Sequence, residues 1–482
     1  MINFRIIARV FSMLLILEGL FMLVSGGVSL IYKEPSAASL FYSALITIVT
    51  GIIVFTPLRH EEKIYSNREG YIIVTGIWLI FSIFGSLPFI FSGSIKSFTD
   101  AYFESMSGFT TTGATVLPDI ESIPHGILFW RSITQWMGGI GIIFISLSIL
   151  PVVKTINVQI SVTDFSGPVT DKIHPRIKEA AKRLITIYVI ITFIEVLMLL
   201  LGGMSLFDAV CHSFSTVSTG GFSTRNGGIS VFSSPFIKVV ITIFMFIAGT
   251  NLTMIYFCLK RNFKKIIENN EFIFYSITCF IFIVIVTSVL YSIPGNSFKK
   301  AILDGSFHVV SIMTTTGFYT EDYTLWGNFL LIILFFLMFT GGTAGSTSGS
   351  IKFVRLLIIA KNNRQELKRM IHPDAIIPVR LDHKIIPQNM VYNLLVFITL
   401  YFMILCASAF IISIMGYDIM TSFSTSASLL GNIGPSMGTF GPFTNYSMIP
   451  AAGKWFFSIL MLLGRLELIT VLVLFTKSFY RN

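Results

Sequence analysis

Ten stretches of predominantly apolar residues, each about 20 residues long or longer, dominate this chain of 482 residues, and about 20 apolar residues are needed for a helix to cross a bilayer. They cover residues 8–33, 39–57, 70–94, 125–151, 180–203, 233–259, 271–293, 325–360, 390–415 and 451–477. Only 12% of the residues are charged, whereas soluble domains carry about 25%. We therefore predict an all-α polytopic membrane protein with ten spans and no soluble domain.

The lysine and arginine residues predict how these spans are oriented. Of the 34 basic residues, seven fall on one side of the predicted topology and 25 on the other, in segments 1–9, 58–69, 152–183, 260–270, 352–384 and 477–482. Short loops rich in Lys and Arg stay in the cytoplasm. Both termini are therefore predicted to be cytoplasmic, and the net charge of +10 reflects topology rather than nucleic-acid binding.

A short polar motif that ends in glycine recurs four times between the later spans. The copies are Thr110-Thr111-Thr112-Gly113, Val217-Ser218-Thr219-Gly220, Thr314-Thr315-Thr316-Gly317 and the more divergent Gly431-Asn432-Ile433-Gly434. The intervals between their final glycines are 107, 97 and 117 residues. One such motif could be an ordinary turn, but four at a similar period on the predicted outer side indicate one structural unit used four times.

An apolar segment too short to span a bilayer precedes each loop. The four segments begin at Asp100, Asp208, Asp304 and Asp418, and we predict re-entrant half-helices with these aspartates as N-caps. Their carbonyl ends, directed inward, carry partial negative charge. Backbone carbonyls of the loops can replace the hydration shell of an ion, and glycine permits the required backbone angles. Because these oxygens are neutral, the pattern favours a weakly hydrated monovalent cation over calcium.

The four loops resemble those of the TrkH family of potassium-uptake proteins, in the superfamily that also contains KtrB and the plant HKT transporters. The resemblance covers essentially the whole chain, and the two extra N-terminal spans favour TrkH over KtrB. It rests on Thr110-Thr111-Thr112-Gly113-Ala114-Thr115, Ser218-Thr219-Gly220-Gly221-Phe222-Ser223, Thr315-Thr316-Gly317-Phe318 and Gly431-Asn432-Ile433-Gly434-Pro435.

This resemblance implies four helix–pore-loop–helix repeats around a pseudo-fourfold axis, with a potassium ion bound in the filter and no organic cofactor. The implied filter residues are Thr111, Thr112, Gly113, Ser218, Thr219, Gly220, Thr315, Thr316, Gly317, Asn432, Ile433 and Gly434. The expected division of the chain is an N-terminal two-helix appendage, 1–69, followed by repeats 70–154, 155–268, 269–384 and 385–482. The resemblance also implies the inner membrane of a bacterium, a homodimer, and a cytosolic nucleotide-binding ring similar to TrkA. We expect that ring at loops 152–183 and 352–384.

The eighth span contains a glycine-rich interruption between Thr340 and Ser350. Its glycines are Gly341, Gly342, Gly345 and Gly349, and each costs a helix about 1 kcal/mol relative to alanine. We predict an intramembrane loop that obstructs the pore, as in the resembled family; the alternative is a surface loop that ends a normal helix.

Arg465 lies inside the last predicted span, where a charged residue costs about 2.5–3.5 kcal/mol. It is therefore predicted to face the pore and contact the glycine-rich loop, or else to form a structural ion pair.

The function predicted from these features is potassium uptake through a channel-like pore gated by the glycine-rich loop. The alternative is a sodium- or proton-coupled symporter of the KtrB or HKT type with weaker potassium selectivity. A membrane enzyme is disfavoured because no HExxH, GxSxG or Walker A motif is present. His212 and His308 occupy matching places in two segments, where Glu104 stands in the first, which indicates repeat architecture rather than a catalytic pair.

Overall fold

The computed structural model describes residues 2–59, 67–149, 173–375, 377–382 and 384–480. The predicted cytoplasmic loop 152–183 therefore lies mostly outside the described residues. The described chain is predominantly helical, and its only strands form the short antiparallel hairpin β1 (Arg380–Leu381) and β2 (Lys384–Ile385).

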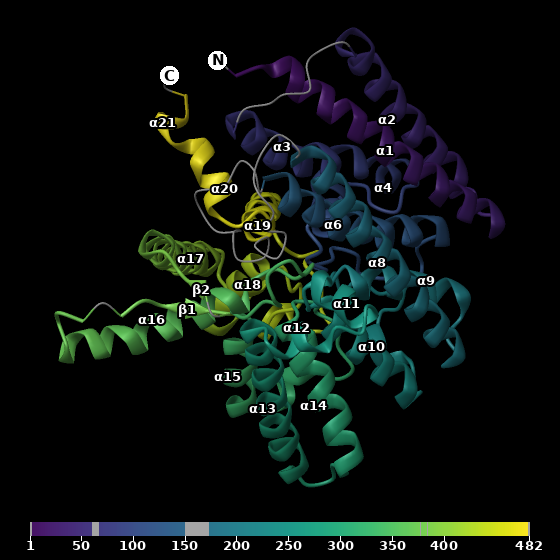
Figure 1. The fold of residues 1–482 in the computed structure, drawn as a ribbon. Coiled ribbons are helices and arrows are strands. Elements are labelled where there is room, and N and C mark those ends of the chain that lie inside the picture. The colour runs from purple at the N-terminus through teal and green to yellow at the C-terminus, as the bar shows by residue number, and fades with distance from the viewer. Residues whose placement is uncertain (1, 60–66, 150–172, 376, 383, 481–482) are drawn as a thin grey trace.

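The first third of the described chain builds one side of the molecule. Helices α1 and α2 pack side by side at its edge (Figure 1). A break at Ser86 separates α3 from α4, and Pro88 lies in the first turn of α4, where its missing amide hydrogen leaves no bond unmade. The bounds are α1 Phe4–Ile31, α2 Ser36–Leu58, α3 Asn67–Gly85, α4 Leu87–Phe91, α5 Phe98–Phe109 and α6 His125–Ile149.

The middle of the chain contains both long and short helices. The bounds are α8 Ile173–Leu201, α9 Leu206–Val217, α10 Pro235–Ala248, α11 Leu252–Leu259, α12 Phe263–Ile267, α13 Asn270–Ser292, α14 Phe298–Met313, α15 Asn328–Leu337 and α16 Phe353–Ile371. Helix α16 extends away from the body, and the β-hairpin lies at the base of this helix (Figure 1), where Asp382 accepts from the amide of Asn270 at 2.8 Å.

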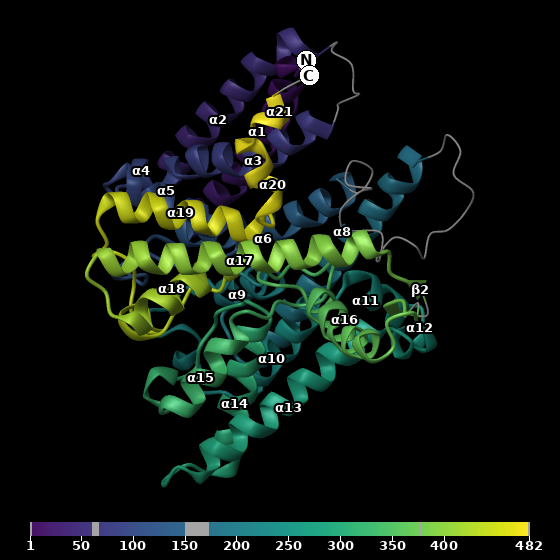
Figure 2. The same cartoon turned by 90° about the vertical axis from the view of Figure 1, so that its left-hand side faces the viewer.

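The C-terminal part returns to the side of the N-terminus. Its helices are α17 Gln388–Ile414, α18 Ile419–Gly431, α19 Ala451–Arg465, α20 Ile469–Leu472 and α21 Lys477–Tyr480. Figure 2 shows α17 and α19 crossing the face of the molecule and both ends of the chain close together. The amide of Asn3 donates to Glu69 at 2.7 Å, and the ring of Phe479 lies 6.4 Å from that of Tyr71. Both ends therefore gather at the start of α3.

Six of the described helices are long and apolar enough to cross a membrane, and two further bent pairs raise the number to eight. One pair, α10 and α11, bends by 107°, and the other, α19 with Ile469–Phe475, bends by 111°. The first bend has a local cause, because the side chain of Asn251 accepts from the amide of Thr253 and caps α11. The predicted continuous spans 233–259 and 451–477 are therefore broken, and the ten-span count is not reached by unbroken helices.

Four short helices, α5, α9, α14 and α18, each lead into one of the predicted loops. Their predicted capping is wrong in three cases. Asp418 caps α18, but Ser205 and Ser297 cap α9 and α14, and Ser97 stands at the start of α5 without a side-chain bond. The three earlier aspartates lie inside the helices and are free to form ion pairs, which the sequence pattern did not distinguish from capping.

Candidate ion-binding ring and gate

The four loops that follow the short helices share one backbone conformation. We call residues 110–113, 218–221, 314–317 and 431–434 the ring loops. The second residue of each has a left-handed φ between 50° and 59°, although none is glycine: Thr111, Thr219, Thr315 and Asn432. The fourth residue of each is a glycine with a φ between 78° and 96°: Gly113, Gly221, Gly317 and Gly434. Three of the left-handed glycines are those predicted, and the second is Gly221 rather than Gly220.

The ring loops contact one another in a closed cycle. A Cβ added to Gly113 would clash with the carbonyl oxygen of Gly220, the residue before the second glycine. A Cβ added to Gly221 would likewise clash with the carbonyl oxygen of Thr316, and one added to Gly317 with that of Ile433. Gly434 closes the cycle against the oxygen of Thr112. Each glycine therefore permits the next loop's backbone to approach, and the carbonyl-bearing residues Thr112, Gly220, Thr316 and Ile433 stand at equivalent places.

Neutral hydrogen bonds hold the ring loops in place. Gln135 of α6 donates from Nε2 to the oxygen of Gly220 at 2.5 Å and accepts at Oε1 from the amide of Phe222 at 3.2 Å. Asn432 donates to the hydroxyl of Thr112 at 3.0 Å, which joins the fourth loop to the first. Gln135 was not predicted, and nothing in its sequence neighbourhood marks it.

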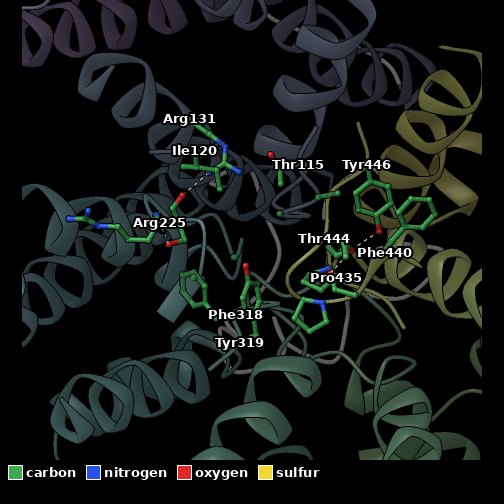
Figure 3. Close-up of a pocket in the computed structure, with 18 residues that line it drawn as sticks. Thr115, Ile120, Arg131, Arg225, Phe318, Tyr319, Pro435, Phe440, Thr444 and Tyr446 are labelled. Carbon is green, nitrogen blue, oxygen red and sulfur yellow. Dashed lines mark hydrogen bonds between the residues drawn. The ribbon is translucent and has the colours of Figure 1, made fainter. Parts of the chain in front are cut away.

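A pocket opens on one side of the ring and is lined by the residues that follow the ring loops (Figure 3). Gly113, Gly221 and Gly434 lie at this pocket, together with Phe318 and Tyr319. The hydroxyl of Tyr446, also in its wall, donates to the oxygen of Gly434 at 2.8 Å.

Two arginines line this pocket, and each has a carboxylate partner. Arg131 donates from Nε to Glu104 at 2.6 Å, and its guanidinium carbon lies 3.5 Å from the ring centroid of Phe222. Arg225 donates to Asp208 at 2.8 Å. Burial acts to raise the pKa of Asp208, but hydrogen bonds from Thr224, Arg225 and Ser205 outweigh it and the pKa is lowered. Because both arginines are paired with carboxylates, their positive charges are offset within the pocket wall.

The opposite side of the ring is covered by the glycine-rich loop, residues 338–352, between α15 and α16. Gly349 donates its amide to the hydroxyl of Thr315 at 2.7 Å, and Thr347 donates to the carbonyl of Val217 at the end of α9 at 3.1 Å. Thr340 and Ile351 form a bridge that closes the base of this loop. Gly341, Gly342 and Gly349 each lie where a Cβ would clash with a backbone oxygen, whereas Gly345 has a φ of 78°. The loop interrupts the eighth apolar stretch as predicted.

Three charged residues hold the loop. Arg465, the last residue of α19, donates to the oxygen of Thr347 at 2.6 Å and to that of Gly138 in α6 at 3.0 Å. Glu271 of α13 accepts from the amides of Ala344 at 2.6 Å and Val354 at 3.1 Å. Lys352 donates to the hydroxyls of Ser346 and Ser348 at 3.3 and 3.0 Å. The contact of Arg465 with the loop was predicted; those of Glu271 and Lys352 were not.

Glu467, two residues after Arg465, pairs with Arg355 of α16. It stands after the end of α19 with a φ of 55°. Arg465 therefore has no carboxylate partner among the described residues, and its charge is directed at backbone oxygens of the loop and of α6.

The fold and the ring define a helical membrane protein of the cation-transport class. A sequence model of the TrkH family, described as a cation transport protein, matches residues 40–480. The chain belongs to the TrkH family.

Individual relatives match over full length. The Trk system potassium uptake protein TrkH of Escherichia coli K12 is 37% identical, with 100% of each chain covered. The Halomonas elongata protein of the same name is 34% identical, also over 100% of both chains. The crystal structure of the potassium transporter TrkH from Vibrio parahaemolyticus superposes with a TM-score of 0.89 at 33% identity, covering 100% of both chains.

Proposed function

We propose that this chain takes up potassium across a membrane through a central pore, with the ring loops as its selectivity filter. The observation that carries the proposal is the closed cycle of the four loops, in which Thr112, Gly220, Thr316 and Ile433 present their carbonyls at equivalent places. Neutral carbonyl oxygens can replace the hydration shell of a potassium ion. The named relatives are potassium-uptake proteins, and transport rather than catalysis is the activity of this family.

The same cycle supports the repeat arrangement that we propose. We assign four helix–pore-loop–helix repeats to residues 70–154, 155–268, 269–384 and 385–482, after a two-helix appendage at 1–69. We count the six long helices and the two bent pairs as eight spans. Helix α6, with 25 residues, is the ninth. Helix α15, the glycine-rich loop and α16 together are the tenth. The gathering of both chain ends at the start of α3 supports termini on one side, which we assign to the cytoplasm.

The glycine-rich loop is the proposed gate. It lies on the side of the ring opposite the pocket and contacts Thr315 of the filter directly. Arg465 places a positive charge beside it, and a buried positive charge raises the barrier to a passing cation.

The partners are proposed from the family. The relatives are named as components of a Trk system, and we propose a homodimer that docks a cytosolic nucleotide-binding ring similar to TrkA. Helix α16, which extends from the body (Figure 1), and the hairpin at its base belong to the expected docking region. The membrane assigned is the inner membrane of a bacterium.

A coupled symporter with weaker selectivity is the second candidate. Each ring loop contributes only one left-handed glycine, so the filter offers fewer turned carbonyls than a longer filter would. The membrane potential alone supplies about 2.3 kcal/mol per charge per 100 mV, which suffices for uncoupled entry.

The test is ion flux into proteoliposomes, with potassium, rubidium, sodium and lithium compared with and without a pH gradient. We expect potassium and rubidium to enter preferentially and the pH gradient to have no effect. Gly113→Ser should lower the potassium-to-sodium flux ratio by about tenfold, which corresponds to ~1.4 kcal/mol of differential binding. Thr112→Ala, which leaves the backbone intact, is the control and should have the smaller effect. An unchanged ratio in Gly113→Ser would remove the ring as the filter, and flux driven by the pH gradient would favour the symporter.

A further inference from the structure

The four short helices carry different residue types at one equivalent position. With the left-handed glycines Gly113, Gly221, Gly317 and Gly434 aligned, the residues nine positions earlier are Glu104, His212, His308 and Thr425. All four are completely buried. Each directs polar atoms at the chain segment that leaves its own ring loop, which we call the exit segment.

His212 connects α9 to the second exit segment. Its Nδ1 lies 2.7 Å from the carbonyl oxygen of Asp208, so this nitrogen carries the hydrogen and donates. In the neutral ring Nε2 accepts from the hydroxyl of Ser223 at 3.0 Å. That hydroxyl in turn accepts from the amide of Arg225 at 3.0 Å. The imidazole therefore spans from the helix backbone to the exit segment two residues beyond Gly221.

His308 repeats this arrangement on α14. Its Nδ1 lies 2.8 Å from the oxygen of Asp304. Its Nε2 lies 3.4 Å from the amide of Thr320 and 3.3 Å from the oxygen of Glu321. The exit segment of the third loop is thus held by the same ring atom as in the second.

The first and fourth loops use other chemistry at the same place. Glu104 accepts from the amide of Val116 at 2.9 Å and from the hydroxyl of Thr115 at 3.0 Å. Thr425 and Ser436 join their hydroxyls at 3.0 Å. A carboxylate, two imidazoles and a hydroxyl therefore all hold the residues two to four positions beyond the filter glycine.

The Glu104 contact also crosses between loops. Arg131, paired with Glu104, donates from Nη1 to the oxygen of Ser223 in the second exit segment at 2.9 Å. The same carboxylate thereby holds two neighbouring exit segments, and Ser223 is held from both sides.

We propose that these four residues are positioning residues for ion selectivity, each holding its exit segment so that the adjacent glycine keeps its left-handed turn. The exit segment follows directly on the carbonyls of the ring, so a shift there changes the size of the oxygen cage. Selectivity between potassium and sodium depends on how well such a cage is held. This inference rests on the proposed role of the ring loops as the filter.

Matched substitutions at His212 separate the two ends of the imidazole. In His212→Asn the amide occupies the place of Nδ1, so the bond to Asp208 remains and the bond to Ser223 is lost. In His212→Gln the amide reaches the place of Nε2, so the bond to Ser223 remains. We expect His212→Asn to lower the potassium-to-sodium flux ratio about fivefold, the effect of one buried hydrogen bond, and His212→Gln to stay near the parent ratio.

A second pair guards against misfolding of the histidine variants. Thr425→Val removes the hydroxyl at nearly constant volume, whereas Thr425→Ser keeps it. Thr425→Val should lower the same flux ratio and Thr425→Ser should not. All variants are measured in proteoliposomes at matched protein amounts. Total rubidium uptake is the control that shows that the pore of each variant is intact.

The series includes Gly221→Ser so that two failures are distinguishable. If Gly221→Ser lowers the ratio while the Asn and Gln variants of His212 behave alike and Thr425→Val behaves like Thr425→Ser, the positioning role is wrong and the filter stands. If Gly221→Ser leaves the ratio unchanged, the filter assignment fails and this inference fails with it. A ratio that is lower in Gly221→Ser, His212→Asn and Thr425→Val, but not in His212→Gln or Thr425→Ser, supports the positioning role.

Discussion

At the residue scale, the second ring loop offers a comparison between adjacent glycines. Gly221 has a φ of 79°, which costs a residue with a side chain about 1–2 kcal/mol, and its added Cβ would meet the backbone of Thr316. Gly220 lacks a left-handed φ, and its added Cβ would meet the amide group of the Gln135 side chain rather than backbone atoms. We therefore expect Gly221→Ala to reduce potassium flux and the potassium-to-sodium ratio more than Gly220→Ala does. Flux at equal protein amount measures both, and an equal or reversed order would contradict the register described above.

The sequence located three of the four left-handed glycines, and the one error, in the second loop, has a specific cause. Two glycines stand side by side at 220 and 221, and the composition of the motif gives no ground to choose between them. The spacing did contain the answer. Gly113 lies nine positions after Glu104, and Gly317 lies nine positions after His308. The residue nine positions after His212 is Gly221, not Gly220. The hydrogen bond from Gln135 to the oxygen of Gly220 could not be predicted, because it depends on how α6 packs against the second loop.

At the element scale, the glycine-rich loop is held by single contacts that can be removed. Arg465 binds the loop at Thr347, whereas Arg355 is a comparably buried arginine nearby that pairs with Glu467 and makes no described contact with residues 340–350. Arg465→Ala and a deletion of residues 343–348 should both increase potassium flux, because each removes part of the obstruction. Arg355→Ala is the matched control and should change flux less. If neither change at the loop increases flux, the loop is not the gate.

The break in the eighth apolar stretch was predictable because four glycines in eleven residues act locally on helix stability. The bends at 249–251 and 466–468 were not, because contacts with distant residues accompany them, in the first case in addition to the local cap at Asn251. The carbonyl of Gly249 accepts from the amide of Thr343 in the glycine-rich loop at 2.8 Å, and Glu467 leaves the line of α19 to reach Arg355. An apolar pattern records the length of a span but not a hydrogen bond to a residue about a hundred positions away.

At the scale of the whole molecule, the spacing of four similar loops predicted a repeated unit, but the closed cycle needed the structure. The cycle runs in chain order from the first loop to the fourth, and contacts between neighbours complete it: Gly434 meets the oxygen of Thr112, and Tyr446 of the last repeat donates its amide to Thr115 of the first at 2.8 Å. Such contacts join residues more than 300 positions apart, which periodicity alone cannot pair.

The protruding helix α16 provides the last prediction, which concerns assembly. Its exposed face carries Arg364 and Lys368, and the half-buried Arg369 is already engaged by Glu366 and the carbonyl of Ile377. If a cytosolic ring docks here, Arg364→Gln with Lys368→Gln should abolish its co-purification, because exposed charges steer and orient such contacts. Arg369→Gln by itself should weaken capture less, because Arg369 is already engaged by Glu366 and the carbonyl of Ile377.

The control for this experiment is Lys299→Gln with Lys300→Gln, an equal loss of charge at the start of α14, on the side that we assign to the exterior. Docking should survive it. The paired α16 variant should keep basal potassium flux in proteoliposomes without the ring, since neither side chain touches the ring loops or the glycine-rich loop. If the α16 variant still co-purifies with the cytosolic nucleotide-binding ring, or if the control loses it equally, the docking site lies on another surface.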